Sequence, residues 1–109
     1  MSSDLTLKLT IRGAAAAGKT SQIQMALNIT NESGRTVNGT LQFSMKDVIS
    51  NDMLRPKAEA SQEVSIPSSG FSKQYNLGDF FDTPKTGAYL VTATLNGNNS
   101  NPLSIKMLL

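Results

Sequence analysis

The chain has no cysteine and no histidine, and these two absences exclude several classes of function. Without cysteine there is no disulfide framework, and nothing in the core requires an oxidising compartment. Most zinc and copper sites, Cys–His and Ser–His–Asp nucleophile systems and histidine pH switches are excluded as well. The eight Asp and Glu residues are isolated along the sequence, so no acid/base pair suggests itself. We therefore expect no catalytic residue, no cofactor, no metal site and no enzymatic activity.

The sequence also lacks a long apolar run and a cluster of basic residues. No apolar stretch approaches the ~20 residues of a membrane-spanning helix. The N-terminal stretch MSSDLTLKL has no basic segment followed by an apolar run, which a secretory signal needs. Ten Lys and Arg against eight Asp and Glu give a net charge of +2, and the basic residues are scattered. We expect neither nucleic-acid nor membrane binding, and a protein that is cytosolic as written or a domain cut from a longer secreted protein.

Apolar and polar residues alternate through most of the chain, which is the period of half-buried β-strands. The clearest stretch is residues 86–107, where TGAYLVTATL and NPLSIKM flank a turn rich in Gly and Asn. These two runs predict an antiparallel pair. The other expected strands cover residues 5–12, 22–29, 37–45, 60–66 and 71–77. Between residues 46 and 59 the alternation is lost, and a helical turn or a short edge strand would both fit before Pro56.

About seven short strands separated by turn signals predict an all-β fold. We expect one domain over residues 1–109, an immunoglobulin-like sandwich of antiparallel strands with Greek-key connections. Strict alternation argues against a doubly wound parallel sheet, whose buried strands would be apolar on both faces. A domain of this size buries roughly two-thirds of its unfolded surface, which is enough for a core.

Two stretches support this architecture by resemblance. The run GAYLVTA at residues 87–93 resembles the G-x-Y-x-V-x-A pattern of macroglobulin-type, filamin-type and fibronectin type III domains. In several of those families the tyrosine hydroxyl bonds back to nearby backbone, and the resemblance implies the same for Tyr89. Residues 31–43, NESGRTVNGTLQF, are similar to the sequence pattern N-x-x-G-x-x-V-x-G-x-v-x-F of macroglobulin and transglutaminase C-terminal β domains. The Cys…Trp…Cys core of true immunoglobulin domains is absent.

Residues 13–20, GAAAAGKT, match the P-loop pattern G-x-x-x-x-G-K-T. In a P-loop the backbone amides cradle phosphates, the lysine reaches the β- and γ-phosphates, and the threonine binds Mg²⁺. That mechanism needs a buried parallel strand before the loop and a helix after it. Here the preceding strand has a polar face, and the following SQIQMALNI alternates like a strand. We interpret the segment as a small, flexible connection between strands, with nucleotide binding as a remote alternative.

The run PSSGF at residues 67–71 resembles the P-T-T-G-F core of the binding loop in chagasin-type inhibitors of cysteine peptidases. Those inhibitors are immunoglobulin-like domains that block a peptidase cleft with loops at one end. The resemblance implies that the turns at residues 31–35, 68–70 and 96–101 line one end here. Ile66 stands where that family has Asn, and the family's G-x-G-G element is missing. A serine-rich turn between two strands is the alternative interpretation.

The stretch Asp79-Phe80-Phe81-Asp82 places two large apolar rings in a loop between charges. At least one ring is expected to close the end of the core, because phenylalanine is often fully buried. The sharper hypothesis is an exposed aromatic anchor for an interface. Asp79 and Asp82 alone supply too few oxygens for calcium. The candidate binding residues are therefore Asn96, Gly97, Asn98, Asn99, Ser68, Ser69, Gly70, Phe71, Phe80 and Phe81.

The alternation of apolar and polar residues predicts a β-sandwich, and the sequence offers no candidate catalytic residues. Together these two observations predict a non-catalytic protein-binding or structural interaction module. We expect a protein partner, which could be a peptidase or a second copy of the chain. Contact would be made by loops at one end or by strand addition at an edge such as Leu5–Arg12. Inhibition of a peptidase by the loops at one end is the alternative function.

Overall fold

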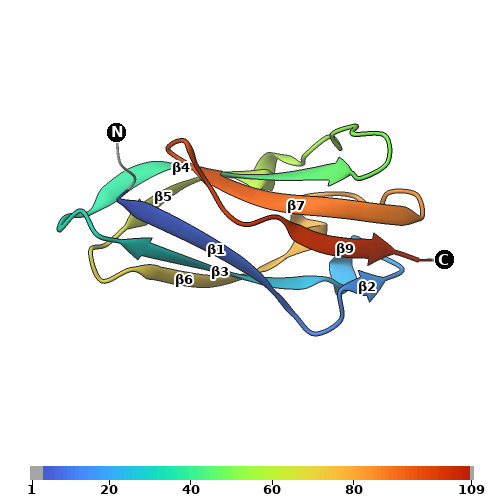
Figure 1. The fold of residues 1–109 in the computed structure, drawn as a ribbon, viewed down its shortest axis with the longest axis horizontal. Coiled ribbons are helices and arrows are strands. Elements are labelled where there is room, and N and C mark those ends of the chain that lie inside the picture. Colours follow the sequence, from blue (N-terminus) through green and yellow to red (C-terminus); the bar gives the residue numbers. More distant parts are fainter. Residues whose placement is uncertain (1–3, 109) are drawn as a thin grey trace.

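The computed structural model describes residues 4–108, which form two β-sheets packed face to face (Figure 1). Seven strands have five residues or more, and two further strands and three 3₁₀ helices have two or three. The strands are β1 (Leu5–Arg12), β2 (Ala16–Ala17), β3 (Gln24–Asn31), β4 (Val37–Asp47), β5 (Ser61–Ile66), β6 (Phe71–Asn76), β7 (Gly87–Leu95), β8 (Asn98–Asn99) and β9 (Leu103–Met107). The 3₁₀ helices are η1 (Thr20–Gln22), η2 (Ala58–Ala60) and η3 (Leu77–Asp79).

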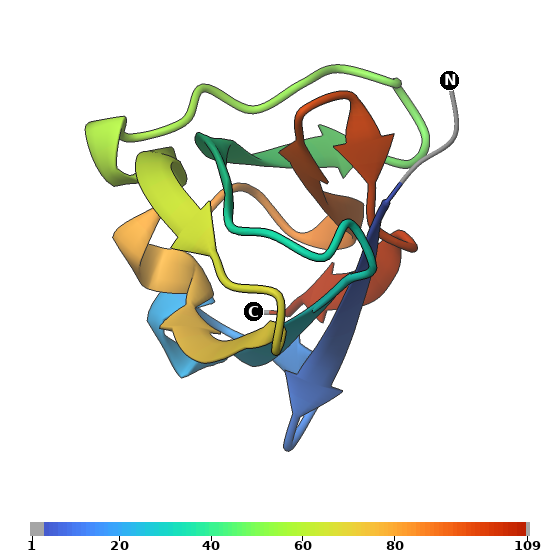
Figure 2. The ribbon, with the colours of Figure 1, turned by 90° about the vertical axis from the view of Figure 1, so that its left-hand side faces the viewer.

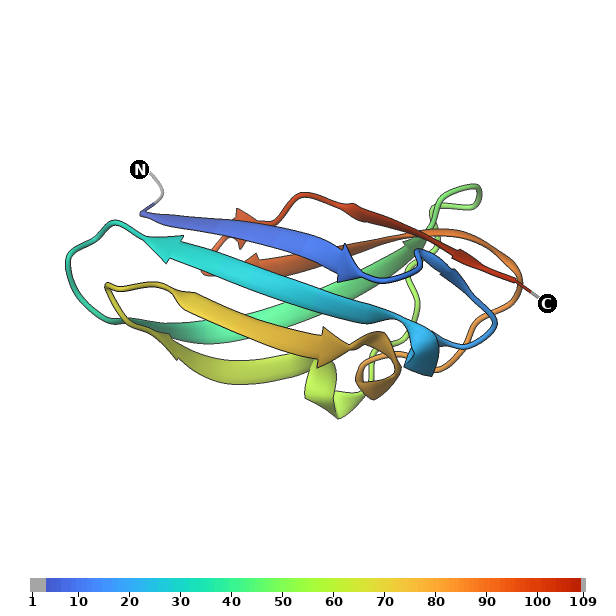
Figure 3. The ribbon, with the colours of Figure 1, turned by 90° about the horizontal axis from the view of Figure 1, so that it is seen from below.

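The smaller sheet has the strand order β1-β3-β6, and all its pairs are antiparallel. The larger sheet has the order β2-β9-β7-β4-β5, with β8 paired to β7. It is antiparallel except for β2, which runs parallel to the end of β9. Figure 3 shows the smaller sheet in front of the larger one, and the connections β3–β4, β5–β6 and β6–β7 cross between them. The predicted immunoglobulin-like sandwich is confirmed.

Alternation places one face of each long strand in the core. In β7 the buried residues are Tyr89, Val91, Ala93 and Leu95, and β9 supplies Ile105 and Met107 opposite them. Leu7 and Leu9 of β1 face this set from the other sheet. Burial of each such side chain stabilises the fold by ~1.5–3 kcal/mol relative to exposure. The Tyr89 hydroxyl donates to the carbonyl oxygen of Lys85 at 2.7 Å, which is the backbone bond that the family resemblance implied.

Strand positions differ from the prediction in four places, one of which is β5, which begins at Ser61 instead of residue 60. The strand expected at residues 22–29 covers 24–31, because Thr20–Gln22 turn into η1 first. The β4 strand continues to Asp47, and β6 ends at Asn76, where η3 begins. Residues 48–57 leave the sheet as a loop, with a single antiparallel bridge between Lys46 and Met53. No helix in the described part of the chain is long and apolar enough to cross a membrane.

The two ends of the sandwich, separated along a 46 Å axis, carry different loops. One end, which we call the polar-loop end, is formed by the turns at residues 32–36, 67–70 and 96–97 and faces the viewer in Figure 2. At the opposite end lie the connections at residues 13–23, 48–57 and 77–86 (Figure 1). Each candidate site therefore belongs to one end or the other.

Candidate functional site

The structure brings most of the predicted binding residues to the polar-loop end (Figure 2). Asn96 and Gly97 have φ angles of 51° and 81° and form the tight turn between β7 and β8. Left-handed geometry at both positions is what an Asn-Gly hairpin turn supplies. Ser68, Ser69 and Gly70 form the turn between β5 and β6, at the same end. The predicted convergence of these turns is therefore observed.

Asn31 ties two of these turns together. Its amide nitrogen donates to the carbonyl oxygens of Arg35 at 2.8 Å and Ile66 at 3.0 Å. Its amide oxygen accepts from the backbone nitrogen of Ser33 at 3.0 Å, and the residue is only 6% exposed. Asn96 is anchored separately, because its amide nitrogen donates to the carbonyl oxygen of Asn38 at 3.3 Å. The polar-loop end is thus an ordered surface.

That surface offers no apolar anchor. Among the described residues, the exposed large hydrophobic side chains are Val48, Ile49, Met53 and Leu108, and none belongs to the turns of this end. Phe71, the aromatic residue of the chagasin-like run, is half-buried and packs against the core. A shallow hollow of about 410 Å³ between β3 and the 68–72 segment is lined largely by polar side chains. Any partner here would be held by hydrogen bonds.

Phe80 and Phe81 lie at the other end and are buried. Each is 1% exposed, and the Phe80 ring stacks on Phe43 with 4.4 Å between centroids. Tyr75 completes an aromatic cluster with both rings. The hypothesis of an exposed aromatic anchor is therefore wrong. The two rings close the end of the core, because η3 turns them inward.

The GAAAAGKT segment does not have the geometry of a P-loop. The backbone nitrogens of Gly18 and Lys19 donate to the side-chain oxygen of Gln22, at 3.1 and 3.2 Å. The Thr20 hydroxyl donates to the carbonyl oxygen of Phe81 at 2.8 Å. The groups that would hold phosphate and Mg²⁺ are thus used within the fold. The segment is also more ordered than the flexible connection we expected, because β2 pairs with β9.

The β1 strand is an edge strand, as predicted, but its middle is occupied. The side-chain oxygen of Asn101 accepts from the backbone nitrogen of Leu9 at 2.9 Å, and its nitrogen donates to the Leu9 carbonyl at 2.8 Å. These are the bonds that an incoming strand would make. Strand addition along Leu5–Arg12 therefore requires Asn101 to be displaced first.

The feature that sequence analysis missed is the loop that follows β4. Val48, Ile49 and Met53 are 44%, 89% and 59% exposed, and we call these three side chains the apolar knob. Single exposed hydrophobic residues are common, but here three lie within one short loop. Leu54, the next residue, instead packs against the core.

Hydrogen bonds hold the apolar knob in one conformation. The Asp47 carboxylate accepts from the backbone nitrogens of Ile49 at 2.8 Å and Ser50 at 3.2 Å. Asn51 adopts a left-handed φ of 65°, and its nitrogen donates to the Asp47 carbonyl. The backbone nitrogen of Leu54 donates to the carbonyl oxygen of Met45 at 2.8 Å, and this bond connects the end of the loop to the sheet. The amides of Ser50 and Ile49, with a smaller contribution from Lys85, hold the pKa of Asp47 below its usual value.

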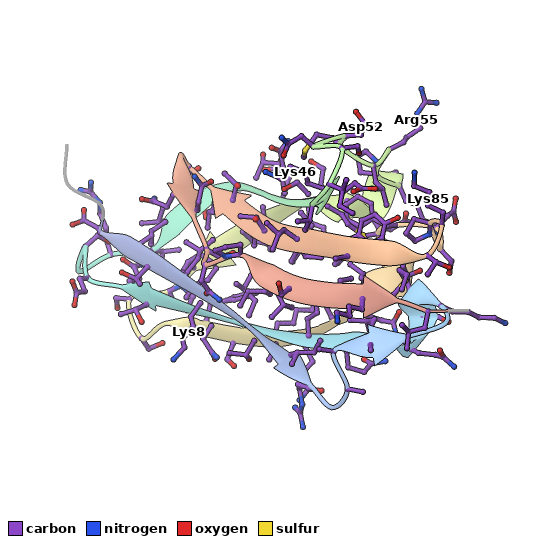
Figure 4. All side chains as sticks on the ribbon, turned by 45° about the vertical axis from the view of Figure 1, so that its right-hand side comes forward. Lys8, Lys46, Asp52, Arg55 and Lys85 are labelled. Carbon is purple, nitrogen blue, oxygen red and sulfur yellow. The ribbon has the colours of Figure 1, made fainter. Side chains whose placement is uncertain are left out.

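Figure 4 shows charged side chains on the knob loop and on the segments next to it: Lys46, Asp52, Arg55 and Lys85. The cations come from three segments: the end of β4, the residue before Pro56, and the loop that precedes β7. The ion pair found among the described residues joins Lys57 to Asp82 at 3.3 Å and involves none of the four. The knob therefore has a mostly basic border, in which Arg55 and Lys85 are exposed and Lys46 is half-buried.

Comparison with known proteins identifies the fold. No family model and no curated protein matches this sequence. The crystal structure of the CARDB domain of the PF1109 protein from Pyrococcus furiosus, in complex with di-metal ions, matches with a TM-score of 0.61 and 16% identity. That match covers 97% of this chain and 94% of the other. The fold is similar to that of this CARDB domain.

Two further structures are similar to this chain. The solution structure of the same CARDB domain matches with a TM-score of 0.64 and 14% identity over 97% of this chain and 95% of that one. A Bacillus anthracis protein described as a lipoprotein matches with a TM-score of 0.53 and 10% identity, over 93% and 73% of the two chains. At these identities the likeness is one of architecture. Within residues 4–108, no group of three or more Asp or Glu side chains could hold a metal ion.

Proposed function

We propose that this domain is a non-catalytic interaction module that binds a protein partner through the apolar knob. The observation that supports this proposal is the exposure of Ile49, which is 89% accessible in a domain whose other isoleucines are buried or partly buried. Burial of an exposed isoleucine in a partner would contribute ~1.5–3 kcal/mol. Val48 and Met53 would add to this from the same loop.

The construction of the loop favours binding as well. A flexible loop loses conformational freedom when it binds, and this loss subtracts from the affinity. Here the Asp47 carboxylate and the left-handed Asn51 already fix the chain. The knob is therefore presented in one conformation, in the manner of a binding hot spot surrounded by polar residues.

Site-specific photocrosslinking tests this function. We would place p-benzoylphenylalanine at position 49 in the cells from which the protein comes, and at position 69 as a matched control at the opposite end. Both positions are exposed, so neither replacement should disturb the fold. We expect a discrete protein adduct from position 49 and none from position 69. Adducts from position 69 alone would move the contact to the polar-loop end, and no adduct from either position would contradict a protein-binding function.

Peptidase inhibition by the polar-loop end is the second candidate. It is supported by the convergence of the turns that contain Ser68–Gly70 and Asn96–Asn99 at one end. Assays against papain-like and subtilisin-like peptidases test it directly. Inhibition at micromolar concentration that is lost when Ser68 and Ser69 are both changed to bulky residues would favour this function over the first. Full peptidase activity in the presence of the protein would remove it.

A further inference from the structure

The charges around the apolar knob indicate what kind of partner surface it fits. We infer that the knob docks into an apolar pocket bordered by Asp or Glu side chains on the partner protein. This inference rests on the proposed protein-binding function and adds the chemistry of the partner to it.

Three cations lie on segments next to the knob, and none of them is in an ion pair among the described residues. Lys46 lies at the end of β4 and is bridged to Met53 through the backbone. Arg55 follows the knob in sequence, and Lys85 lies in the loop before β7. Both side chains are exposed (Figure 4). Complementary charges around a contact steer association and select the partner. Carboxylates on the partner would match this border.

Two acidic groups lie near these cations, and their positions differ. Asp47 is 9% exposed, and its carboxylate is turned toward the amides of its own loop. The negative charge of Asp47 interacts with Lys85, but the carboxylate itself is not accessible to a partner. Asp52 is exposed between Ile49 and Met53 in the sequence of the loop. Arg55 and Lys85 are exposed and Lys46 is half-buried, while Asp52 is the exposed carboxylate of the loop.

The exposed Asp52 favours a protein over an anionic lipid surface. Insertion of Ile49 and Met53 into a bilayer would remove from water the Asp52 carboxylate that lies between them in the loop, and burial of a charge without a partner is costly. A protein pocket can instead place a donor beside that one carboxylate. A second copy of this chain is also disfavoured, because a two-fold contact through the knob would bring two basic borders together.

A binder selection tests the inference with a defined probe. Designed ankyrin-repeat proteins have concave randomised faces, which suit a convex knob. We would select a library against the wild-type domain and against Ile49→Ser, and keep the binders that are lost on Ile49→Ser. These binders should be enriched in Asp and Glu around apolar positions. The double variant Arg55→Glu, Lys85→Glu should lower their affinity about tenfold or more, while Lys8→Glu, a matched reversal on β1, should change it less than about twofold.

Each other outcome has a distinct meaning. Binders that depend on Ile49 but tolerate the double reversal would overturn the acidic partner and leave the protein-binding function in place. A selection without any binder that depends on Ile49 would overturn the inference, while the crosslinking result would still decide the function. Sedimentation of the wild type, but not of Ile49→Ser, with phosphatidylserine–phosphatidylcholine vesicles would replace the protein pocket by a lipid surface. Urea unfolding of each variant confirms that the fold is retained.

Discussion

Replacement of Asn31 by alanine should loosen two of the three turns at the polar-loop end. Asn31 is nearly buried, and its side chain joins the 32–36 turn to the end of β5 through Ile66. Alanine removes the donor from the Ile66 carbonyl, in a position that water does not readily reach. It also removes the bonds to the Arg35 carbonyl and the Ser33 amide, which order the turn.

The magnitude follows from these contacts. A buried carbonyl left without a donor costs about 1–3 kcal/mol, and the loss of the partly exposed bonds adds about 0.5–1.5 kcal/mol. We therefore expect Asn31→Ala to lower the free energy of unfolding by about 2–4 kcal/mol. For a chain of 109 residues the entropy of unfolding is ~230 cal/mol/K, so the melting temperature should fall by about 9–17 °C.

Urea denaturation followed by circular dichroism measures the first quantity, and calorimetry measures the second. Asn28→Ala is the matched control, because Asn28 lies on the same strand, is exposed and accepts one bond from the Ser72 hydroxyl. That control should lose less than about 0.5 kcal/mol. Asn31→Asp should be at least as damaging as Asn31→Ala near neutral pH, because a carboxylate cannot donate to the Ile66 carbonyl and repels it. A loss for Asn31→Ala no larger than for Asn28→Ala would refute the reasoning.

Two further predictions concern β1 and the knob. Asn101→Ala should lower the free energy of unfolding by about 1–3 kcal/mol, because two bonds to Leu9 are lost. Light scattering should show more self-association than in the wild type, and a monomer as stable as the wild type would contradict the edge-blocking role. Because the pKa of Asp47 is depressed in the folded state, its stabilisation is present above the unfolded value of about 3.9 and is lost as pH falls through the folded pKa. The amide NMR shifts of Ile49 and Ser50 should therefore titrate below about pH 3.9. Asp47→Asn should abolish that titration. Shifts that do not change with pH in the wild type would exclude the role of the carboxylate.

The strands could be predicted because each carries its own pattern. Leu5–Arg12 and Leu103–Met107 alternate from end to end, and the observed strands have these bounds. Tyr89 could be placed from a short motif, because its hydroxyl bonds to Lys85, only four residues away. Local patterns of this kind depend on neighbours in the sequence, so sequence alone is sufficient to read them.

The candidate sites depend on contacts that sequence does not display. Phe80 is buried because it meets Phe43, which is far away in the chain. The pair Val48–Ile49 resembles the start of a buried segment, and nothing local shows that Met45 and Leu54 already occupy the core beside it. The usable signal was the loss of alternation after Asp47, followed by the turn former Asn51. It marks a loop, but only the fold shows that the loop is exposed.

The contrast between the two ends argues for the knob as the binding end. At the polar-loop end, Asn31 and Asn96 direct their amides to backbone carbonyls of the same end, so much of the local hydrogen-bonding capacity is already used. A partner that bound there would have to replace these hydrogen bonds or use only the groups that remain free. Either way, binding would gain little free energy. At the knob, the Asp47 carboxylate satisfies backbone amides of the loop, while Ile49 is exposed and the nearby cations are in no ion pair among the described residues. Association there would gain apolar burial and ionic contacts while the hydrogen bonds of the loop stay in place, which makes it the end where binding is favoured.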